Sequence, residues 1–379
     1  MRRSMALFAA VLFGAGLSVA SAEVVITGDV QYRFEYNYYQ KDSASAKYYT
    51  SSDYKNKYAW DLFLKATPVD KLLLGVRLSN PAGYNMDNIA GNPLLTPNPL
   101  AIPEFYFKWT PDPLFALSAG IIPVYGSTVR DLTMFEGPAG YLDASKLCGP
   151  GVYPWAVGMN NSMKGVEVGS SFLTSKDFSI GADLIYALAS DWVPPNADTT
   201  TATIDELGKN QYRFDFTVPM TFLDKMITAT PELSARTNVY RSTDYKKANH
   251  SAAGGLDVTA KPIKGFLLKA GFAYGQYSNS AIVTGTTTQI DPAGFLLNDG
   301  LAYTLPFMSI LLDHSFGMCN DRHATTKVSQ FLNFWDLKFP IPITKLTLIP
   351  RIRVWYYGNS SDDHDKLWIR PEFNLKAAF

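Results

Sequence analysis

Apolar and polar residues alternate with a period of two in several stretches, and this pattern restricts the fold more than any other feature of the chain. In residues 31–38, four aromatic side chains occupy the even positions and polar residues occupy the odd ones. Residues 57–66, 211–218 and 367–379 repeat the pattern, the first of these with two interruptions. Successive side chains of a β-strand point to opposite faces, so each stretch predicts a strand with one apolar and one polar face. A soluble β-sandwich alternates in the same way, so the period alone leaves both architectures open.

The spacing of turns separates these two architectures. Six short connections carry similar turn residues, and each is followed at once by an apolar strand start: they are 67–71, 110–113, 174–177, 221–225, 261–264 and 341–345. Longer stretches rich in Gly, Asn, Asp, Ser and Pro lie between them. Short turns at one end and long loops at the other are typical of transmembrane β-barrels, and a sandwich gives no reason for such regularity.

Counting strands between the turns predicts fourteen, in one all-β domain over residues 23–379. The expected fold is a transmembrane antiparallel up-and-down β-barrel with both termini at the same end. Residues 293–320 also alternate, and a hairpin there would raise the count to sixteen strands, as an alternative. We prefer fourteen because residues 304–307 lack the polar chemistry of the six turns. Long loops are then expected at about 126–160 and 277–326.

Prolines and aromatic residues occupy particular places in the predicted strands. Pro231, Pro350 and Pro371 fall inside strands, where each predicts a bulge or a misplaced boundary. Aromatic residues near strand ends match the girdles that flank the apolar band of a membrane barrel. These residues are Tyr38, Tyr39, Trp60, Trp109, Trp335, Trp355 and Trp368.

The first 22 residues have the features of a secretory signal peptide. Arg2 and Arg3 precede an apolar run over residues 5–19, and Ala20-Ser21-Ala22 provides a small-x-small cleavage site. Beyond residue 22 no apolar stretch reaches the length of a membrane-spanning helix. The chain is 14% aromatic and 18% charged, against about 25% charged residues in soluble domains. An exported chain that is poor in charge and rich in aromatics fits a barrel embedded in lipid.

The last residue, Phe379, ends an alternating strand, and the opening strand contains the stretch 28–36. With the signal peptide and the turn asymmetry, these features resemble the bacterial outer-membrane porins, whose last strand ends in an aromatic residue. The resemblance implies a place in the lipid of a Gram-negative outer membrane, reached by export through the periplasm. It also implies that the barrel assembly machinery reads the Phe379 strand. In shape the nearest relatives are the 14-stranded porins and alginate-export-like channels, and no motif selects a subfamily.

On this register the polar faces of the strands line the interior of the barrel, and these charged residues are the candidate site. The predicted pore-lining residues are Arg33, Glu35, Lys57, Asp61, Lys65, Arg77, Glu104, Lys108, Arg213, Asp215, Glu232, Arg236, Lys269, Arg351, Arg353, Arg370 and Glu372. They can pair across strands and solvate the interior, or impose an electrostatic field on passing solutes. Arg351 and Arg353 concentrate positive charge on one strand and favour a weak preference for anions.

The leading hypothesis is therefore a porin that lets small hydrophilic solutes diffuse passively. One alternative is a substrate-specific channel for carboxylates or sugars, and a second is a barrel enzyme or adhesin that acts through its loops. The sequence contains no catalytic motif, and we expect no enzyme, cofactor or metal site. The four histidines, His250, His314, His323 and His364, are expected in loops. The zero net charge gives no indication of a nucleic-acid partner, and the sequence leaves monomer and trimer equally open.

The only two cysteines, Cys148 and Cys319, fall in the two long predicted loops. Export through an oxidising compartment allows a disulfide between them. Such a bond would join loops from distant hairpins across the mouth of the barrel. Two unpaired thiols are the alternative, because the sequence does not establish the required distance.

Overall fold

The structure is a computed structural model. It describes residues 23–42, 48–79, 101–124, 127–134, 162–188, 212–241, 248–278, 281–282, 289–290, 292–321, 329–359 and 362–379.

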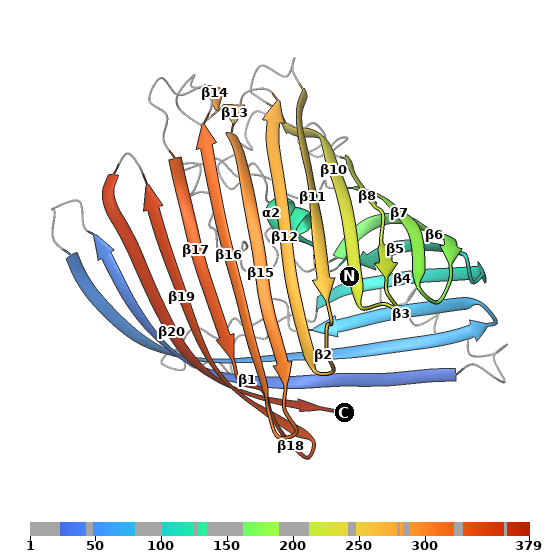
Figure 1. Ribbon diagram of the computed structural model, residues 1–379, viewed down its shortest axis with the longest axis horizontal. Helices are drawn as coiled ribbons and strands as arrows, with labels where there is room; N and C mark the ends of the chain where they lie inside the picture. The colour runs from blue at the N-terminus through green and yellow to red at the C-terminus, as the bar shows by residue number, and fades with distance from the viewer. Residues whose placement is uncertain are drawn as a thin grey trace, which may run out of the picture.

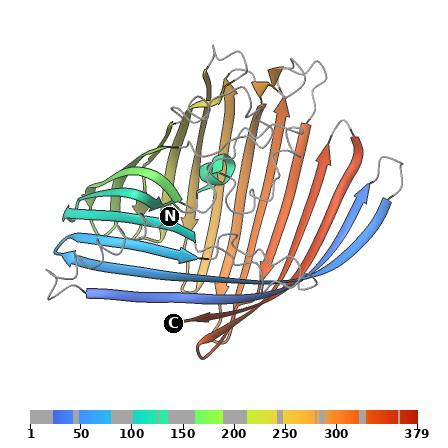
Figure 2. The ribbon, with the colours of Figure 1, turned by 180° about the vertical axis from the view of Figure 1, so that it is seen from behind.

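Eighteen strands form one antiparallel sheet that closes on itself (Figures 1 and 2). They are β1 (Glu23–Asp42), β2 (Tyr48–Val69), β3 (Leu72–Ser79), β4 (Ala101–Asp112), β5 (Phe115–Pro123), β6 (Ser162–Thr174), β7 (Phe178–Leu188), β8 (Tyr212–Thr217), β9 (Met220–Phe222), β10 (Ile227–Arg241), β11 (Ala248–Ala260), β12 (Phe266–Ser278), β15 (Pro292–Thr304), β16 (Ser309–Asp321), β17 (Ser329–Lys338), β18 (Ile341–Ile343), β19 (Leu346–Asn359) and β20 (Asp362–Ala378). The first strand, β1, pairs with both β2 and β20, so the described sheet has no free edge. A separate small hairpin consists of β13 (Ala281–Ile282) and β14 (Gln289–Ile290).

We call each complete crossing of the barrel wall a stave, whether it consists of one strand or of two strands separated by a break. Two staves are broken in this way, and prolines lie at both breaks. The break between β8 and β9 contains Pro219, and the facing part of β10 contains Pro231. The break between β17 and β18 contains Pro340, and the facing part of β19 contains Pro350. Proline has no N–H to donate, so the two prolines at each break, which lie one position apart in the register, interrupt the ladder without changing the path of the strand. Each broken pair is one stave, and the barrel therefore has sixteen staves.

The predicted count of fourteen is wrong, and the alternative of sixteen is correct. The missing hairpin is β15 and β16, which occupy most of the segment 277–326 that was expected to be a loop. Their turn over residues 305–308 is closed by the N–H of Leu305, which donates to the carbonyl of Met308 at 2.8 Å. This backbone bond closes the turn without the Asp and Lys residues that identified the other six.

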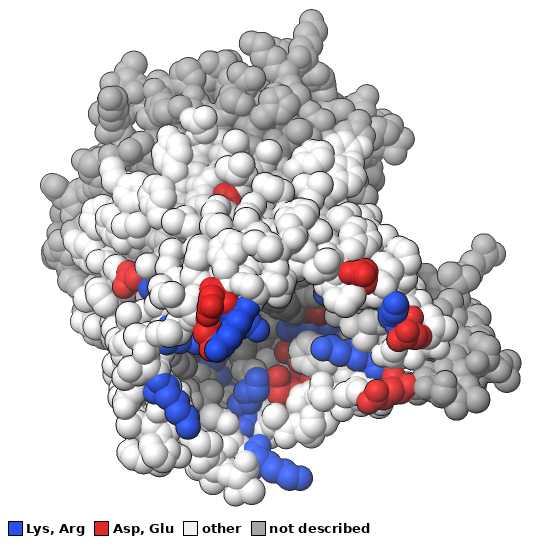
Figure 3. Space-filling view, turned by 45° about the vertical axis from the view of Figure 1, so that its right-hand side comes forward, with Lys and Arg blue, Asp and Glu red and all other residues white. Residues whose placement is uncertain are grey.

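The barrel has a short-turn end, with seven brief connections between staves, and a long-loop end. Both described termini lie at the short-turn end, where the backbones of Gly28 and Phe379 exchange two hydrogen bonds of 3.0 Å. The outer wall is a broad belt with few charged residues, whereas charges gather around a hollow (Figure 3). In β1, Tyr32 and Phe34 are exposed on the outside while Arg33 and Glu35 are buried, as the alternation predicts. No helix among the described residues is long and apolar enough to cross a membrane.

A candidate pore constriction

A short helix, α2 (Thr128–Met134), lies inside the barrel against the inner face of β10, β11, β12 and β15 (Figures 1 and 2). It belongs to the connection between β5 and β6, most of which was expected to be a long loop. Ser127 caps the helix, because its Oγ accepts the N–H of Arg130 at 3.0 Å. Thr128 attaches it to the wall: its N–H and its hydroxyl both donate to the Asp257 carboxylate, at 2.9 and 2.5 Å.

The wall beneath α2 is lined by small residues that allow this close approach. A side chain at Gly271 would overlap with Thr128 and with Asp257. A Cβ at Gly255 would lie 2.7 Å from the Val129 side chain, which is fully buried. Val129 packs instead against the buried alanines of β11 and β12, Ala253 and Ala273. The glycines and alanines of these two strands therefore form a seat for the helix.

Acidic residues of the wall surround Arg130, the basic residue of α2. Arg130 Nε lies 3.0 Å from Glu232 Oε1 and 3.8 Å from Asp215 Oδ2. Asp215 also accepts a hydrogen bond of 2.8 Å from Arg213 Nε. The three wall residues, Asp215, Arg213 and Glu232, are all buried. A buried charge is costly unless it is paired, so these contacts fix the position of Arg130 and hence of the helix.

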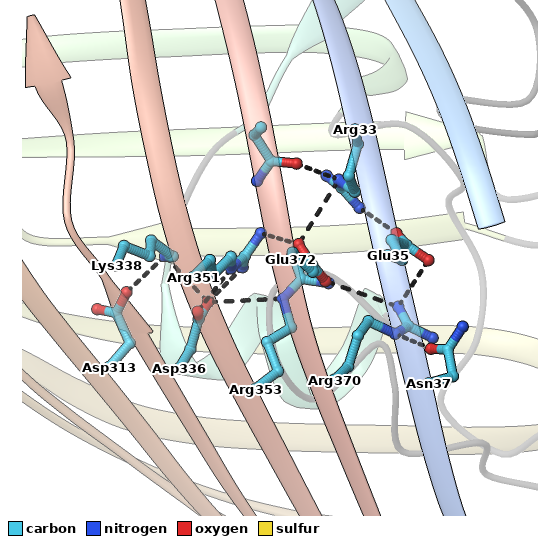
Figure 4. A network of polar contacts seen from close by, with 11 residues as sticks. Arg33, Glu35, Asn37, Asp313, Asp336, Lys338, Arg351, Arg353, Arg370 and Glu372 are labelled. Carbon is cyan, nitrogen blue, oxygen red and sulfur yellow. Dashed lines mark hydrogen bonds and ion pairs between the residues drawn. The ribbon is translucent and has the colours of Figure 1, made fainter. Parts of the chain in front are cut away.

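On another part of the inner wall, β16, β17, β19, β20 and β1 carry a connected set of charges, the arginine network (Figure 4). Its members are Arg33, Glu35, Asn37, Asp313, Asp336, Lys338, Arg351, Arg353, Arg370, Glu372 and Asn374. They share one face because the register places Lys338 opposite Arg351, Arg351 opposite Glu372, and Glu372 opposite Glu35. Three strand pairings thus bring together residues that are more than 300 positions apart.

The carboxylates of Asp336 and Glu372 organise the network. Asp336 binds both Arg351, through paired contacts that include one of 2.6 Å, and Lys338 at 3.0 Å. Glu372 receives Arg353 Nη1 at 3.0 Å and lies 3.5 and 3.6 Å from Arg351 and Arg33. Bidentate arginine pairs are the most directional ion pairs in proteins, so these side chains are held in fixed positions.

Arg33 and Arg370 extend the network onto β1. Arg33 donates to Glu35 at 3.1 Å and to Asn374 at 3.0 Å. Arg370 donates to Asn37 at 2.5 Å and lies 3.7 Å from Glu35. The network holds five basic and four acidic side chains, and the group around α2 holds two basic residues (Arg130 and Arg213) and three acidic ones (Asp215, Glu232 and Asp257). Among the described side chains, the network thus has one more basic than acidic residue and the group around α2 has one more acidic than basic residue, so charges of both signs border the interior.

Toward the long-loop end, the interior carries an apolar cluster that the sequence did not predict. Trp355 is fully buried among Leu296, Leu332 and Phe334, and Leu132 of α2 packs against this cluster. Trp355 also stacks on Trp368 with ring centroids 4.4 Å apart, and the Arg370 guanidinium lies 4.1 Å from the Trp368 ring. Trp355 and Trp368 were expected in an outer girdle. Their register positions, opposite Phe334 and each other, place them inside instead, because they share the face of Arg353 and Arg370.

Toward the short-turn end, the predicted interior residues are more accessible. Lys65, Lys108 and Lys269 are exposed on the inner face, with 53% of the Lys269 side chain accessible. Arg77 bridges Asp61 at 2.7 Å and Glu104 at 3.1 Å. Lys57 and Arg236 occupy the same face in the register, opposite Arg33 and Arg213, and their side chains lie outside the described residues.

The two cysteines are placed differently from each other. Cys148 lies outside the described residues. The backbone of Cys319 lies in β16, opposite Gly294 and Gln330, rather than in a loop. Three of the four histidines, expected in loops, are also in strands: His250 in β11, His314 in β16 and His364 in β20.

Comparisons with solved structures agree with this architecture. The outer membrane channel DcaP of Acinetobacter baumannii is 13% identical and has a TM-score of 0.55, over 95% of this chain and 98% of that one. OmpF of Salmonella typhi, in complex with daunomycin, is 11% identical with a TM-score of 0.55, over 94% and 97% of the two chains. An anion-selective porin from Comamonas acidovorans is 11% identical with a TM-score of 0.53, over 95% and 100%. No protein-family model matches the sequence, and comparison with curated proteins gives no match.

A closed antiparallel barrel that spans the full length of these structures defines the class: the chain has the fold of the bacterial outer-membrane porins. At identities of 11–13%, the likeness concerns the fold and leaves the subfamily open.

Proposed function

We propose that the protein is an outer-membrane channel that lets small hydrophilic solutes diffuse passively, with a weak preference for anions. The observation that carries the proposal is α2, which is attached to the inner wall of a closed barrel and faces a lumen bordered by the arginine network. A helix held inside the barrel narrows the passage, and fixed charges on its borders act on a solute at short range.

The preference for anions rests on the accessible charges. The most exposed charged side chain of the described ion pairs on the inner face is Lys269, while the inner acidic residues Glu35, Asp215, Glu232 and Glu372 are buried in ion pairs. Several inner arginines are buried as well, but of the predicted pore-lining residues Lys65, Lys108 and Lys269 are exposed and no acidic residue is, so a mobile ion meets more basic than acidic groups. The Comamonas porin of similar fold is anion-selective, which is consistent with this proposal.

The location and biogenesis follow from the same proposal. A signal peptide over residues 1–22 would direct export through the periplasm, and the apolar outer belt would be covered by outer-membrane lipid. The terminal strand presents Phe379, whose ring is exposed beside Gly28, to the assembly machinery.

Reversal potentials of the purified channel in planar bilayers, under a KCl gradient, test the selectivity. We expect a small reversal potential whose sign indicates preference for anions. In the double variant Arg351→Gln/Arg353→Gln, the reversal potential should shift toward the sign that indicates preference for cations. The shift follows because two positive charges are removed, which leaves Asp336 paired with Lys338 alone and Glu372 with the more distant Arg33 and Arg370. Lys225→Gln, in an exposed turn at the short-turn end, is the control and leaves the potential unchanged.

A clear preference for cations in the unmodified channel would contradict the proposed anion selectivity. Current that is blocked by one class of carboxylate or sugar would identify a substrate-specific channel instead. Absence of any current from the folded barrel would contradict the channel function itself.

A further inference from the structure

The outer wall of the barrel is hollowed where β4, β5, β6 and β7 lie side by side (Figure 1). The hollow has a volume of about 470 Å³, and we call it the outer groove. The side chains that line it are those of Phe105, Ala119, Ile121, Val166 and Tyr186. Apart from the phenol hydroxyl of Tyr186, these side chains offer no polar atom.

The groove faces outward because its residues share the outer face in the register. Ala119 pairs with Val166, and Val166 pairs with Tyr186. The residues on either side of Val166 in β6, Gly165 and Glu167, belong to the inner face. Val166 and Tyr186 are 40% and 39% exposed, so the groove is open to whatever surrounds the barrel.

Two glycines form the floor of the groove with their backbones. Gly120, whose φ of +122° is rarely adopted by a residue with a side chain, pairs with Gly165 of β6. A Cβ at Gly120 would lie 2.3 Å from the Phe105 carbonyl oxygen, and a Cβ at Gly165 would lie 2.1 Å from the Tyr186 carbonyl oxygen. Glycine inside a strand marks a bend or a close approach of two backbones, so this part of the wall is recessed between the two aromatic rings.

Lys164 lies at the end of the groove that is nearer to the long loops. It is the third residue of β6, and it pairs with Ile121 and with Leu188, the last residue of β7. Its side chain is exposed on the outer face, whereas β5 contains no charged residue and the only one in β7, Asp183, lies inward opposite Thr217. A lysine at the border of the apolar belt keeps its methylene stem on the apolar surface and places its ammonium group at the level of the lipid head groups.

Two tyrosines extend the polar end of the groove. Tyr212 lies in the same row as Lys164, because Leu188 pairs with both of them. The Tyr212 ring stacks on the Tyr186 ring with centroids 5.5 Å apart. Tyrosine is enriched where the apolar belt meets the head groups, since its ring is apolar and its hydroxyl donates and accepts hydrogen bonds. The groove therefore has a polar end toward the long loops and an apolar body toward the middle of the wall.

We propose that the outer groove is a binding site for a lipid with an anionic phosphate head group, taken from the leaflet at the long-loop end. The phosphate accepts hydrogen bonds from the ammonium group of Lys164, and one acyl chain lies in the groove against Val166, Ala119 and Phe105. Lysine binds phosphate as a point charge, and basic residues beside apolar wall surface are a common recognition element for anionic lipids. A zwitterionic head group fits less well, because its own positive charge would lie near Lys164. The inference goes beyond the proposed channel function, which requires no bound lipid.

Native mass spectrometry of the folded full chain, released from detergent micelles, tests this proposal. The probes are dioleoylphosphatidylglycerol, which is anionic, and dioleoylphosphatidylcholine, which has the same acyl chains and a zwitterionic head group. At equal concentrations we expect the adduct with phosphatidylglycerol to be several-fold more abundant. Lys164→Gln should remove this excess, and Lys164→Arg should retain it. Ala119→Leu fills the groove and should reduce the adducts with both lipids several-fold.

Lys176→Gln and Ala182→Leu are the matched controls, and both should bind the lipids as the unmodified protein does. Lys176 is exposed in the short turn of the same β6–β7 hairpin, and Ala182 lies on the outer face of β7 nearer to that turn. The shift in gel mobility on heating confirms that each barrel is folded.

Equal adducts of the two lipids on the unmodified protein overturn the proposal. A folded Lys164→Gln or Ala119→Leu barrel that binds the lipids like its matched control overturns it as well. Channel conductance is measured separately, so the proposed function stands or fails independently of this result.

Discussion

The close contact between α2 and the barrel wall leads to a specific prediction, because it depends on the absence of a side chain at Gly271. Gly271→Ala would place a Cβ where Thr128 and Asp257 now meet, and both Thr128 hydrogen bonds to the carboxylate would be lost. Hydrogen bonds to a charged group contribute about 1.5–3 kcal/mol each, so losing both costs at least about 3 kcal/mol. Each 1.4 kcal/mol is about a factor of ten, so the ratio of attached to detached helix falls roughly 100-fold.

Single-channel recording measures this change directly. The Gly271→Ala channel should show a larger conductance level or frequent transitions to one, because the helix leaves the lumen for part of the time. Gly254→Ala is the matched control: it lies on the outer face of β11, where the added Cβ meets the flexible end of Leu233 at 2.9 Å and the Glu232 carbonyl oxygen at an ordinary contact distance of 3.7 Å. A Gly271→Ala barrel that folds and conducts like the unmodified protein would show that α2 does not limit the passage.

Three further predictions concern the wall and the cysteines. With cysteines placed singly at positions 33 and 34, a membrane-impermeant thiol reagent added to permeabilised vesicles should label Arg33→Cys and not Phe34→Cys; the reverse result would contradict the register. Trp355→Ala should lower the free energy of unfolding by about 3–5 kcal/mol, measured by urea titration, since a fully buried ring is removed; a change below about 1 kcal/mol would contradict its packing role. Titration of free thiols in the folded protein should detect none if Cys148 and Cys319 are bonded, and two titratable thiols would end that prediction.

The architecture could be predicted because it depends on local alternation. Arg33 and Glu35 alternate with Tyr32 and Phe34 under one simple physical constraint, the opposite direction of successive side chains in a strand. The β15–β16 hairpin was missed because its turn around Pro306 is closed by a backbone hydrogen bond and carries none of the polar residues on which the strand count depended.

The interior arrangement could not be predicted because it depends on distant contacts. Thr128 reaches Asp257 only because Gly271, on the next strand, leaves room for it, and no local pattern connects these three positions. Trp355 was assigned to the outside from its residue type, although its alternation with Arg353 already placed both on the inner face. For Trp355, the strand register predicts the face more reliably than the residue type does, because the opposite register would put the Arg353 charge into hydrocarbon.

Liposome swelling tests the central claim most directly, namely that this barrel passes small hydrophilic solutes through a lumen narrowed by α2. Liposomes that contain the folded full chain are diluted into isotonic solutions of neutral sugars of increasing size. The account predicts rapid swelling with the smallest sugars and a steep decline in rate as the sugar grows, with the decline moved to larger sugars in Gly271→Ala. Liposomes that contain the folded barrel and do not swell in any of these sugars would contradict the account.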